Sequence, residues 1–323
     1  MRVGILTSGG DCQSLNATMR GVAKALYKMF EDVEIIGFED GYKGLMYADY
    51  QIMKPSDFSG ILTKGGTILG TSRQPFKLMR VPDENGLDKV EAMKHTYRKL
   101  KLECLVVLGG NGSQKTANLL REEGLNVVSL PKTIDNDLVM TDHTPGYGST
   151  AKYVASTLRE IILDATCYAH PSVTIVELMG RHAGWVTAAS VLARTEYSRN
   201  PYLIYMPEHA FDMEEFKKSL KMALEQETAV VVCVSEGIAD KDGRFICEYA
   251  DAASVDGFGH KMLTGCGKYL ENYVKAEFGI KCRSIELNLP QRCSSLLASA
   301  TDIDEAEKAG KAAVVAALDG ETG

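Results

Sequence analysis

The sequence predicts an α/β protein with mainly parallel sheets, arranged in two lobes. Short apolar runs rich in β-branched residues alternate with segments of helical pattern, and this alternation is typical of βαβ units. Glycine pairs follow several of the apolar runs, as in turns that lead from a strand into a helix. The chain has 323 residues, which exceeds one typical domain, so we expect two lobes.

Along the chain, the short apolar runs predict the strands and the longer periodic segments between them predict the helices. Strands are expected at residues 3–7, 33–38, 104–108, 126–130, 173–178, 202–205, 229–234 and 283–287. Helices are expected at residues 15–30, 90–99, 113–123, 149–165, 184–192, 213–226, 260–278 and 304–318. We expect residues 1–140 to form one lobe and 141–290 the other, with a C-terminal helix in 291–323 returning to the first lobe.

Composition narrows the functional classes. The net charge is −7 and the isoelectric point is about 5.5, which argues against nucleic-acid binding. The eight cysteines form no CxxC pair, so we expect reduced thiols and a cytoplasmic protein. The first strand begins at the initiator Met, and no apolar run approaches the roughly 18 residues of a membrane span, so we expect neither a signal peptide nor a membrane partner.

The stretch PKTIDND at residues 131–137 carries the strongest chemical signal. It follows an apolar, strand-like run, and open α/β sheets bind ligands at the carboxyl ends of their strands. Asp135 and Asp137 lie two residues apart beside Thr133 and Lys132. One carboxylate can accept a hydroxyl proton, the other can hold a metal or orient the first, and the lysine can meet phosphate charge. These residue types suit phosphoryl transfer, although a turn capped by Asp and Asn would use the same residues.

Glycine-rich turns supply candidate phosphate contacts. SGGD at residues 8–11 and GGNGS at 109–113 follow predicted strands, and KGGTILGTSR occupies 64–73. Glycine lets backbone N–H groups approach an anion, and a helix N-terminus adds its dipole. None of these turns matches the Walker pattern or the GxGxxG fingerprint, so neither a P-loop enzyme nor a nicotinamide dehydrogenase is favoured.

Together these motifs resemble the phosphofructokinase family, and the resemblance runs along nearly the whole chain. Its elements are TSGGD at 7–11, Asn16, DGYKGL at 40–45, GGTILGTSR at 65–73, GGNGS at 109–113, PKTIDND at 131–137, MGR at 179–181, SEG at 235–237, Arg283 and Gln291-Arg292. Residues 142–149 and 181–185 are most similar to the branch rich in pyrophosphate-using members. The resemblance implies two Rossmann-like lobes.

The resemblance also implies a reaction in glycolysis, in which the 1-hydroxyl of fructose 6-phosphate attacks a phosphoryl group. Asp135 would be the base, with Asp137, Thr133, Lys132 and Arg181 as further catalytic residues. The sugar would be bound by Thr133, Asp135, Met179, Gly180, Arg181 and Glu236, and its 6-phosphate by Arg283 and Arg292. The donor would be bound by Gly9, Gly10, Tyr42, Arg73, Gly109, Gly110, Asn111, Gly112 and Ser113. Magnesium would be held by Asp135 and Asn111.

Two residues bear on the donor and disagree. In the family a carboxylate at the position of Gly112 repels the α-phosphate of ATP, so glycine leaves room for a nucleotide. Lys132 is the residue that pyrophosphate users carry, but lysine also occurs together with glycine in ATP-using branches. Exclusion by size and charge is the harder constraint, so we expect ATP, with pyrophosphate as the alternative.

Three departures from the family pattern bear on the metal and on the 6-phosphate pocket, and Gln13 and Ser14 also replace the Pro-Gly usual after the first GGD. Asn111 replaces an aspartate near the metal, so magnesium would depend on Asp135, water and the donor phosphates. Ser172 and Leu289 replace an arginine and a histidine of the 6-phosphate pocket, for which His170 or Lys152 are possible substitutes. Another phosphosugar, such as sedoheptulose 7-phosphate, or a non-catalytic regulatory or sensing subunit therefore stays open.

The resemblance implies two further features of the protein. A homo-oligomer is expected, because family members borrow residues such as Arg283 across an interface. Family members also continue beyond the helix that precedes Gly323, through at least one more strand and helix.

Overall fold

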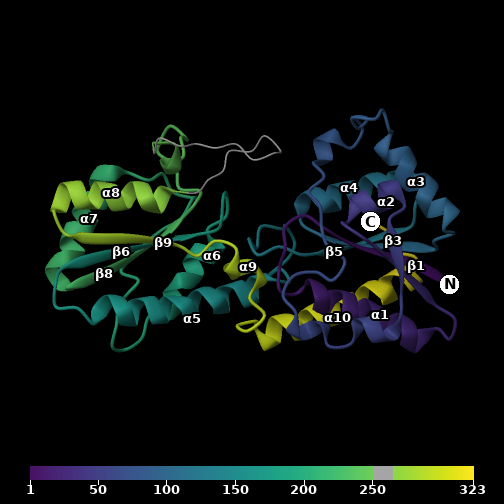
Figure 1. The fold of residues 1–323 in the computed structure, drawn as a ribbon, viewed down its shortest axis with the longest axis horizontal. Coiled ribbons are helices and arrows are strands. Elements are labelled where there is room, and N and C mark those ends of the chain that lie inside the picture. Colours follow the sequence, from purple (N-terminus) through teal and green to yellow (C-terminus); the bar gives the residue numbers. More distant parts are fainter. Residues whose placement is uncertain (250–264) are drawn as a thin grey trace. The chain divides into compact units, whose positions relative to one another are not determined.

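The computed structural model describes residues 1–249 and 265–323, which form two compact units (Figure 1). Unit 1 comprises Met1–Ser149 and Arg292–Gly323, and unit 2 comprises Thr150–Gln291. The sequence predicts the first boundary near residue 140, whereas in the structure it lies between Ser149 and Thr150. It lies later in the chain than expected because the segment after residue 131 folds back within unit 1, where the Thr133 N–H donates to the Pro145 carbonyl over 3.3 Å.

Unit 1 is built on a sheet with the strand order β3-β2-β1-β4-β5. Its strands are β1 (Arg2–Ser8), β2 (Glu34–Phe38), β3 (Tyr50–Met53), β4 (Cys104–Gly109) and β5 (Val127–Pro131). All neighbouring strands run parallel except β2 and β3. β1 and β4 read as nearly continuous apolar runs because both faces of a central parallel sheet are covered.

The helices of unit 1 are α1 (Leu15–Met29), α2 (Tyr42–Tyr47), α3 (Lys89–Lys99), α4 (Asn111–Glu122) and α10 (Ala300–Leu318), with short 3₁₀ turns at Pro55–Phe58, Ile61–Thr63 and Phe76–Leu78. Although α10 comes from the end of the chain, it packs beside α1 (Figure 1). A Cβ added at Gly310 would lie 2.2 Å from the Thr18 carbonyl oxygen, so glycine is required for this close approach.

Unit 2 contains a fully parallel sheet with the strand order β7-β8-β6-β9. Its strands are β6 (Ser172–Leu178), β7 (Leu203–Tyr205), β8 (Ala229–Ser235) and β9 (Lys281–Glu286). The helices are α5 (Tyr147–Thr166, which begins in unit 1), α6 (Trp185–Ala188), α7 (Met213–Gln226), α8 (Cys266–Phe278) and α9 (Pro290–Cys293, which ends in unit 1), with 3₁₀ turns at Ala189–Ala193 and Ile246–Tyr249. A separate apolar cluster covers each face of the sheet.

The predicted fold class is confirmed, since both units are α/β with mainly parallel sheets. Some elements differ from expectation. β3 was not expected, because three of its four residues are exposed and it forms an antiparallel edge. The expected helix 184–192 divides into α6 and a 3₁₀ turn. The start of the expected helix 260–278 lies outside the described residues, and α8 matches its remainder.

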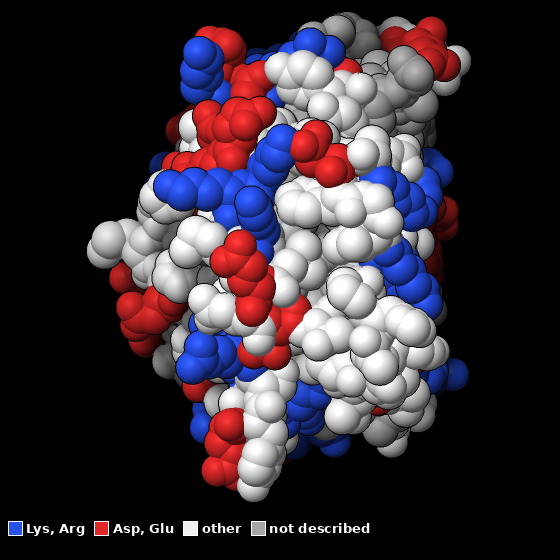
Figure 2. Space-filling view, turned by 90° about the vertical axis from the view of Figure 1, so that its left-hand side faces the viewer, with Lys and Arg blue, Asp and Glu red and all other residues white. Residues whose placement is uncertain are grey.

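Two findings concern membrane-spanning helices and the distribution of surface charge. Within the described residues, no helix combines the length and apolarity needed to cross a membrane. On the face drawn in Figure 2, acidic and basic side chains are interspersed among uncharged ones, so the described residues form no broad basic area there of the kind that binds nucleic acid.

Candidate active site

Two glycine turns and the segment that carries Asp135 lie at the carboxyl ends of three neighbouring strands of unit 1. In the parallel register Ser8 of β1 is the partner of Gly109 of β4, and Gly109 is the partner of Pro131 of β5. The segments that begin at Gly9, Gly110 and Lys132 therefore leave the same edge of the sheet side by side. This edge is where open α/β sheets bind their ligands.

The first glycine turn is fixed by its neighbours. Gly9 has a φ of +88°, a conformation that favours glycine. Its carbonyl accepts a 2.8 Å hydrogen bond from Thr71 Oγ1, and its N–H donates to the Ser72 carbonyl over 3.4 Å. These contacts bring the neighbouring Arg73, whose side chain is exposed, to the predicted donor turn. The sequence-predicted donor residues Gly9, Gly10 and Arg73 thus belong to one local structure.

The second turn forms the N-terminus of α4. Ser113 is buried in the first turn of this helix, and its Oγ donates to Ser8 Oγ over 3.0 Å. A Cβ added at Gly109 would lie 2.2 Å from Ser113 Cβ, so packing alone requires that glycine. Asn111 and Gly112 are exposed at the helix start. Unpaired backbone N–H groups and the helix dipole make this end suited to an anion.

Tyr42 supports this helix end from behind. Its side chain is only 1% exposed, and its hydroxyl donates to the Ser113 carbonyl over 2.8 Å. Burial raises the pKa of Tyr42 far above its usual range. The resemblance places Tyr42 among the donor-binding residues, whereas the structure gives it a supporting position beneath the α4 N-terminus.

Gly112 differs from the other glycines of the site. A Cβ added there would meet no heavy atom of the described residues within 4 Å. The fold therefore leaves open space beside Gly112, and a side chain at this position would enter that space. This is the feature that the sequence argument for a nucleotide donor requires.

Lys132 is buried beneath the first glycine turn. It is 3% exposed, its Nζ donates to the Gly10 carbonyl, and a Cβ added at Gly9 would lie 3.7 Å from that Nζ. Burial lowers the pKa of Lys132, and the nearby Cys12, Asp11 and Asp135 oppose that shift. Lys132 thus braces the glycine turn with a positive charge behind it. A Cβ added at Gly10 would lie 3.8 Å from Nη1 of Arg292, which puts a second cation beside the turn.

The segment after Lys132 carries the candidate base. Asp135 is partly buried, and its N–H donates to Thr133 Oγ1 over 3.1 Å. Asn136 has a φ of +52° and is 9% exposed, while Asp137 is exposed. Asn tolerates this left-handed conformation better than most residues, and it turns the chain between the two aspartates. The structure therefore separates the environments of Asp135 and Asp137.

In unit 2, the MGR and SEG motifs lie at neighbouring strand ends. β6 ends at Leu178 opposite Ser235 of β8. The Gly180 N–H donates to Glu236 Oε1 over 3.3 Å, and the Glu236 N–H donates to the Leu178 carbonyl over 2.8 Å. A Cβ added at Gly237 would lie 1.9 Å from the Arg181 carbonyl oxygen, so the two motifs are tightly packed. Met179, Gly180, Arg181 and Glu236 are thus brought together.

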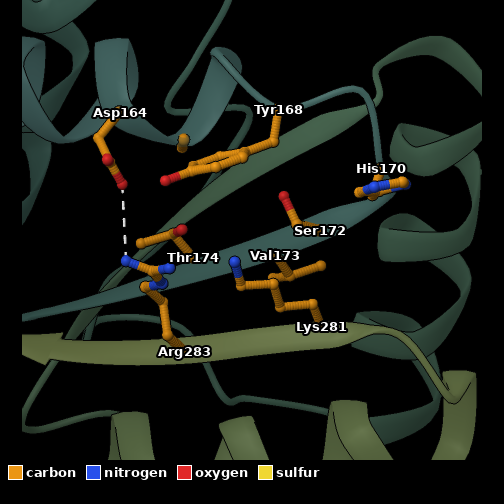
Figure 3. A pocket seen from close by; sticks show the side chains of 9 residues that line it. Asp164, Tyr168, His170, Ser172, Val173, Thr174, Lys281 and Arg283 are labelled. Atoms are coloured by element: carbon orange, nitrogen blue, oxygen red, sulfur yellow. Dashed lines mark ion pairs between the residues drawn. The ribbon is translucent and has the colours of Figure 1, made fainter.

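Arg283 lies elsewhere in unit 2. Its Cα partner in the sheet is Thr174, which is about 13 Å from Leu178 at about 3.3 Å per residue of β6. The pocket there has an empty volume of about 380 Å³, part of it open to solvent (Figure 3). Its lining includes Asp164, Tyr168, His170, Ser172, Lys281 and Arg283. The structure therefore separates Arg283 from the MGR and SEG motifs.

Ion pairing and stacking hold the cations of this pocket. Arg283 Nη1 lies 3.5 Å from Asp164 Oδ2, and the Lys281 ammonium lies 4.7 Å from the centroid of the Tyr168 ring. Figure 3 shows the Arg283 and Lys281 side chains extending from β9. His170, which the sequence offered as a substitute for a missing cation, lines the same pocket.

Some positioning residues carried little signal in the sequence. Gln291 is fully buried; its Oε1 accepts from the Met179 N–H over 3.2 Å, and its carbonyl accepts from Thr150 Oγ1 over 2.9 Å. The motif match alone drew attention to Gln291. Glu208 accepts from the Gly184 N–H over 2.6 Å, and nothing in the sequence singled it out.

The structure contains no preformed metal cluster: in the described residues, no group of three or more His, Cys, Asp or Glu side chains could hold an ion. One buried carboxylate oxygen near the glycine turns, Oδ1 of Asp11, has no hydrogen-bond partner in the described part of the chain. Magnesium in phosphoryl-transfer sites usually keeps one or two carboxylates and takes its other ligands from phosphates and water. The side chains of Asp135, Asn111 and Asp11 carry oxygens of the chemical kind that magnesium takes, so the residue types in this region suit such a site.

Comparison with known proteins assigns this chain to a family. Residues 2–317 match the family model described as Phosphofructokinase. An "ATP-dependent 6-phosphofructokinase" of Spirochaeta thermophila is 45% identical over 248 residues, which is 74% of this chain and 64% of that protein. The chain thus spans slightly less than two thirds of that relative. A "Pyrophosphate--fructose 6-phosphate 1-phosphotransferase" of Amycolatopsis methanolica is 34% identical over 324 residues, with coverages of 100% and 89%.

Two solved structures have a fold similar to that of this chain. A pyrophosphate-dependent phosphofructokinase from Marinobacter aquaeolei matches with a TM-score of 0.83 and 28% identity, and the match covers 99% of this chain and 76% of that protein's chain. One from Nitrosospira multiformis has a TM-score of 0.84 and 26% identity, with coverages of 99% and 77%. The family match over almost the whole chain and these structural likenesses lead to one conclusion: the chain belongs to the phosphofructokinase family.

Proposed function

We propose that this protein is a 6-phosphofructokinase that transfers a phosphoryl group from ATP to the 1-hydroxyl of fructose 6-phosphate. The observation that carries the proposal is the position of the Asp135 segment beside two glycine turns at one sheet edge, within a chain of this family. Phosphoryl transfer requires positioning and charge neutralisation more than covalent help. The set of residues at this edge offers both.

In the proposed reaction, Asp135 accepts the proton of the attacking hydroxyl, and Thr133 orients Asp135 through its Oγ1 contact with the Asp135 N–H. The exposed Asp137 contributes negative charge beside the base. The N-terminus of α4, Gly9, Gly10 and Arg73 bind the donor phosphates. Magnesium, held by Asp135 and Asn111 with donor oxygens, would neutralise phosphate charge.

The sugar-binding roles fall to unit 2 and Arg292. Met179, Gly180, Arg181 and Glu236 bind the sugar in this proposal, and Arg181 also stabilises the transferring group. Arg283 and Arg292 bind the 6-phosphate. Because Arg283 of β9 pairs with Thr174, about 13 Å along β6 from Leu178 before the MGR motif, we propose that it serves the site of a second copy, as expected for a homo-oligomer.

The donor preference rests on Gly112. A Cβ added at this residue meets no heavy atom of the described residues within 4 Å, which supports the proposal that the α-phosphate of ATP lies here. Pyrophosphate remains the second candidate, since Lys132 is the residue found in pyrophosphate users and the Amycolatopsis relative carries that activity in its name. The burial of Lys132 and its bond to Gly10 weaken this alternative, because its charge acts on the donor only through the turn. The free cysteines support a cytoplasmic location.

Two linked assays test the proposal. Purified protein is given fructose 6-phosphate and magnesium with either ATP or pyrophosphate, and fructose 1,6-bisphosphate is measured. We expect turnover with ATP, and a fall in kcat of roughly 10²–10⁴-fold in Asp135→Ala with an unchanged melting temperature. Turnover with pyrophosphate alone would show that pyrophosphate, and not ATP, is the donor. Binding of fructose 6-phosphate with no turnover from either donor would favour a sensing subunit, and activity on sedoheptulose 7-phosphate alone would change the substrate.

A further inference from the structure

The segment that carries Thr133 and Asp135 belongs to no helix or strand, yet it is closely braced. Besides the Thr133 N–H bond to Pro145, Thr144 Oγ1 donates to the Thr133 carbonyl over 2.7 Å. The Thr144 N–H donates to Asn136 Oδ1 over 2.8 Å. The outgoing segment, residues 132–136, is therefore tied to the returning segment, residues 144–146. The position of the candidate base depends on where that returning segment is held.

A carboxylate from α10 holds it. Asp302 is 3% exposed, its Oδ1 accepts from the Gly146 N–H over 2.8 Å, and its Oδ2 accepts from Ser149 Oγ over 2.5 Å. Gly146 in turn forms a parallel bridge with Thr133. Three steps thus connect Asp302 to the segment of Asp135, and all of them lie in unit 1.

The surroundings of Asp302 are specialised for this contact. Ser149 Oγ also accepts from the Ser299 N–H over 3.1 Å, and Ser299 is the N-cap of α10. The carboxylate therefore lies near the N-termini of both α5 and α10, where helix dipoles favour negative charge. A Cβ added at Gly148 would lie 3.2 Å from Asp302 Cβ, so any other residue there would crowd this approach.

We propose that Asp302 is a positioning residue that sets the place of Thr133 and Asp135 through Gly146. This inference rests on the proposed function of Asp135 as the base. Asp302 itself contacts backbone and serine groups and no reacting atom. Displacement of a catalytic group by about 1 Å can lower the rate by roughly 10²-fold, so the effect on kcat should be large for a residue outside the substrate contacts.

The test compares Asp302→Ala and Asp302→Asn with Asp304→Asn. The control is on the same helix, is 64% exposed, and pairs only with Lys308 in the described residues. We expect Asp302→Ala to lower kcat by about 10- to 100-fold with the ATP KM changed by less than about two-fold. Asp302→Asn should lose less, because its amide oxygen can still accept from Gly146. Asp304→Asn should behave as wild type.

A double-mutant cycle separates positioning from general destabilisation. If Asp302 acts through the base, Asp302→Ala should cause no further loss of kcat in the Asp135→Ala background. A purely structural defect would lower the active fraction by the same factor in both backgrounds, and that result would overturn the inference. A kcat of Asp302→Ala equal to that of the wild-type protein would also overturn the inference.

Amide hydrogen exchange supplies a readout that does not depend on activity. Loss of the anchor should speed exchange at the amides of Thr133, Thr144 and Gly146 in Asp302→Ala, while exchange in the Asp304→Asn control stays unchanged. Unchanged protection at these amides would refute the inference even if the wild-type protein proved inactive. Absence of wild-type turnover together with faster exchange would instead refute the proposed function and leave the anchoring role supported.

Discussion

Replacement of Gly112 by aspartate should weaken the use of ATP while preserving the fold. An added Cβ at this position meets no atom within 4 Å in the described residues, so the side chain can be accommodated. Gly112 is the second residue of α4, after the N-cap Gly110 and Asn111. An acidic residue near a helix N-terminus is stabilising by about 0.3–1 kcal/mol. The melting temperature should therefore stay the same or rise.

The size of the effect follows from the charge introduced. Two unit charges at about 4 Å repel by about 1 kcal/mol in bulk water and by about 4 kcal/mol at the effective dielectric constant of a protein surface. Because about 1.4 kcal/mol corresponds to a tenfold change in affinity, these two energies correspond to roughly 5-fold and 10³-fold weaker binding of ATP. Because Gly112 is exposed, the effect should lie between them. We expect the KM for ATP to rise about 10- to 100-fold through repulsion of the α-phosphate.

Steady-state kinetics with varied ATP at saturating fructose 6-phosphate measures this KM. Two matched variants distinguish an effect of charge from an effect of size. Gly112→Asn has the shape of the aspartate without its charge, and Gly112→Ala adds only a methyl group. Charge exclusion predicts a large rise in KM for Asp alone, and that rise should shrink at high salt if the site stays open to solvent. An equal rise for Asn would show that size decides, and an unchanged KM for Asp would refute the assignment of this space to the nucleotide.

Two further predictions concern stability and assembly. Glu307 of α10 is 14% exposed at its side chain and pairs with Lys311, Lys24 and Arg20; the Lys311 hydrogen bond, helped by Lys24, lowers its pKa from 4.5 to about 2. A depressed folded-state pKa gives stability that is present above the unfolded value of 4.5 and lost as the pH falls through about 2. Glu307→Gln should therefore lower the free energy of unfolding at pH 7 by about 1–2 kcal/mol, less than the pKa shift alone implies because Lys24 and Lys311 are about half exposed. It should also flatten the pH dependence of that free energy in this window, as measured by denaturant unfolding against a control at the exposed Glu31. Co-expressed Asp135→Ala and Arg283→Ala chains should together regain activity that neither has alone, because a mixed oligomer would contain a site with both residues; no gain over the separate variants would place Arg283 outside the partner's site.

The fold could be predicted where sequence pattern and local signals agree. The limits of α7 match the expected residues 213–226, because Asp212 accepts from the N–H groups of Glu214 and Glu215 and starts the helix where the periodic pattern starts. β3 could not be predicted, because an exposed edge strand has no apolar alternation to identify it. Local signals thus define the buried elements better than the edges.

The site shows the same division between local and long-range information. Residues in strand-end motifs, such as Asp135 and Glu236, could be found because their chemistry and their place in the topology are both encoded within a few residues. Asp302 could not, since its role depends on a contact with Gly146, 156 positions away. Tyr42 was found by resemblance but given a direct role, because burial of its side chain depends on packing that no local pattern reveals.

The identity of residue 112 is best explained by a ligand. At Gly109 a Cβ would clash with Ser113, so the fold demands glycine there whether or not the protein binds a donor. At Gly112 no such demand exists, and glycine inside a helix is less stable than alanine by about 0.5–1 kcal/mol. The chain therefore keeps a residue that stability disfavours at the exposed N-terminus of α4. A gain in melting temperature for Gly112→Ala would establish that cost, and retained ATP use in the same variant would show that the space, rather than backbone freedom, is what the donor requires.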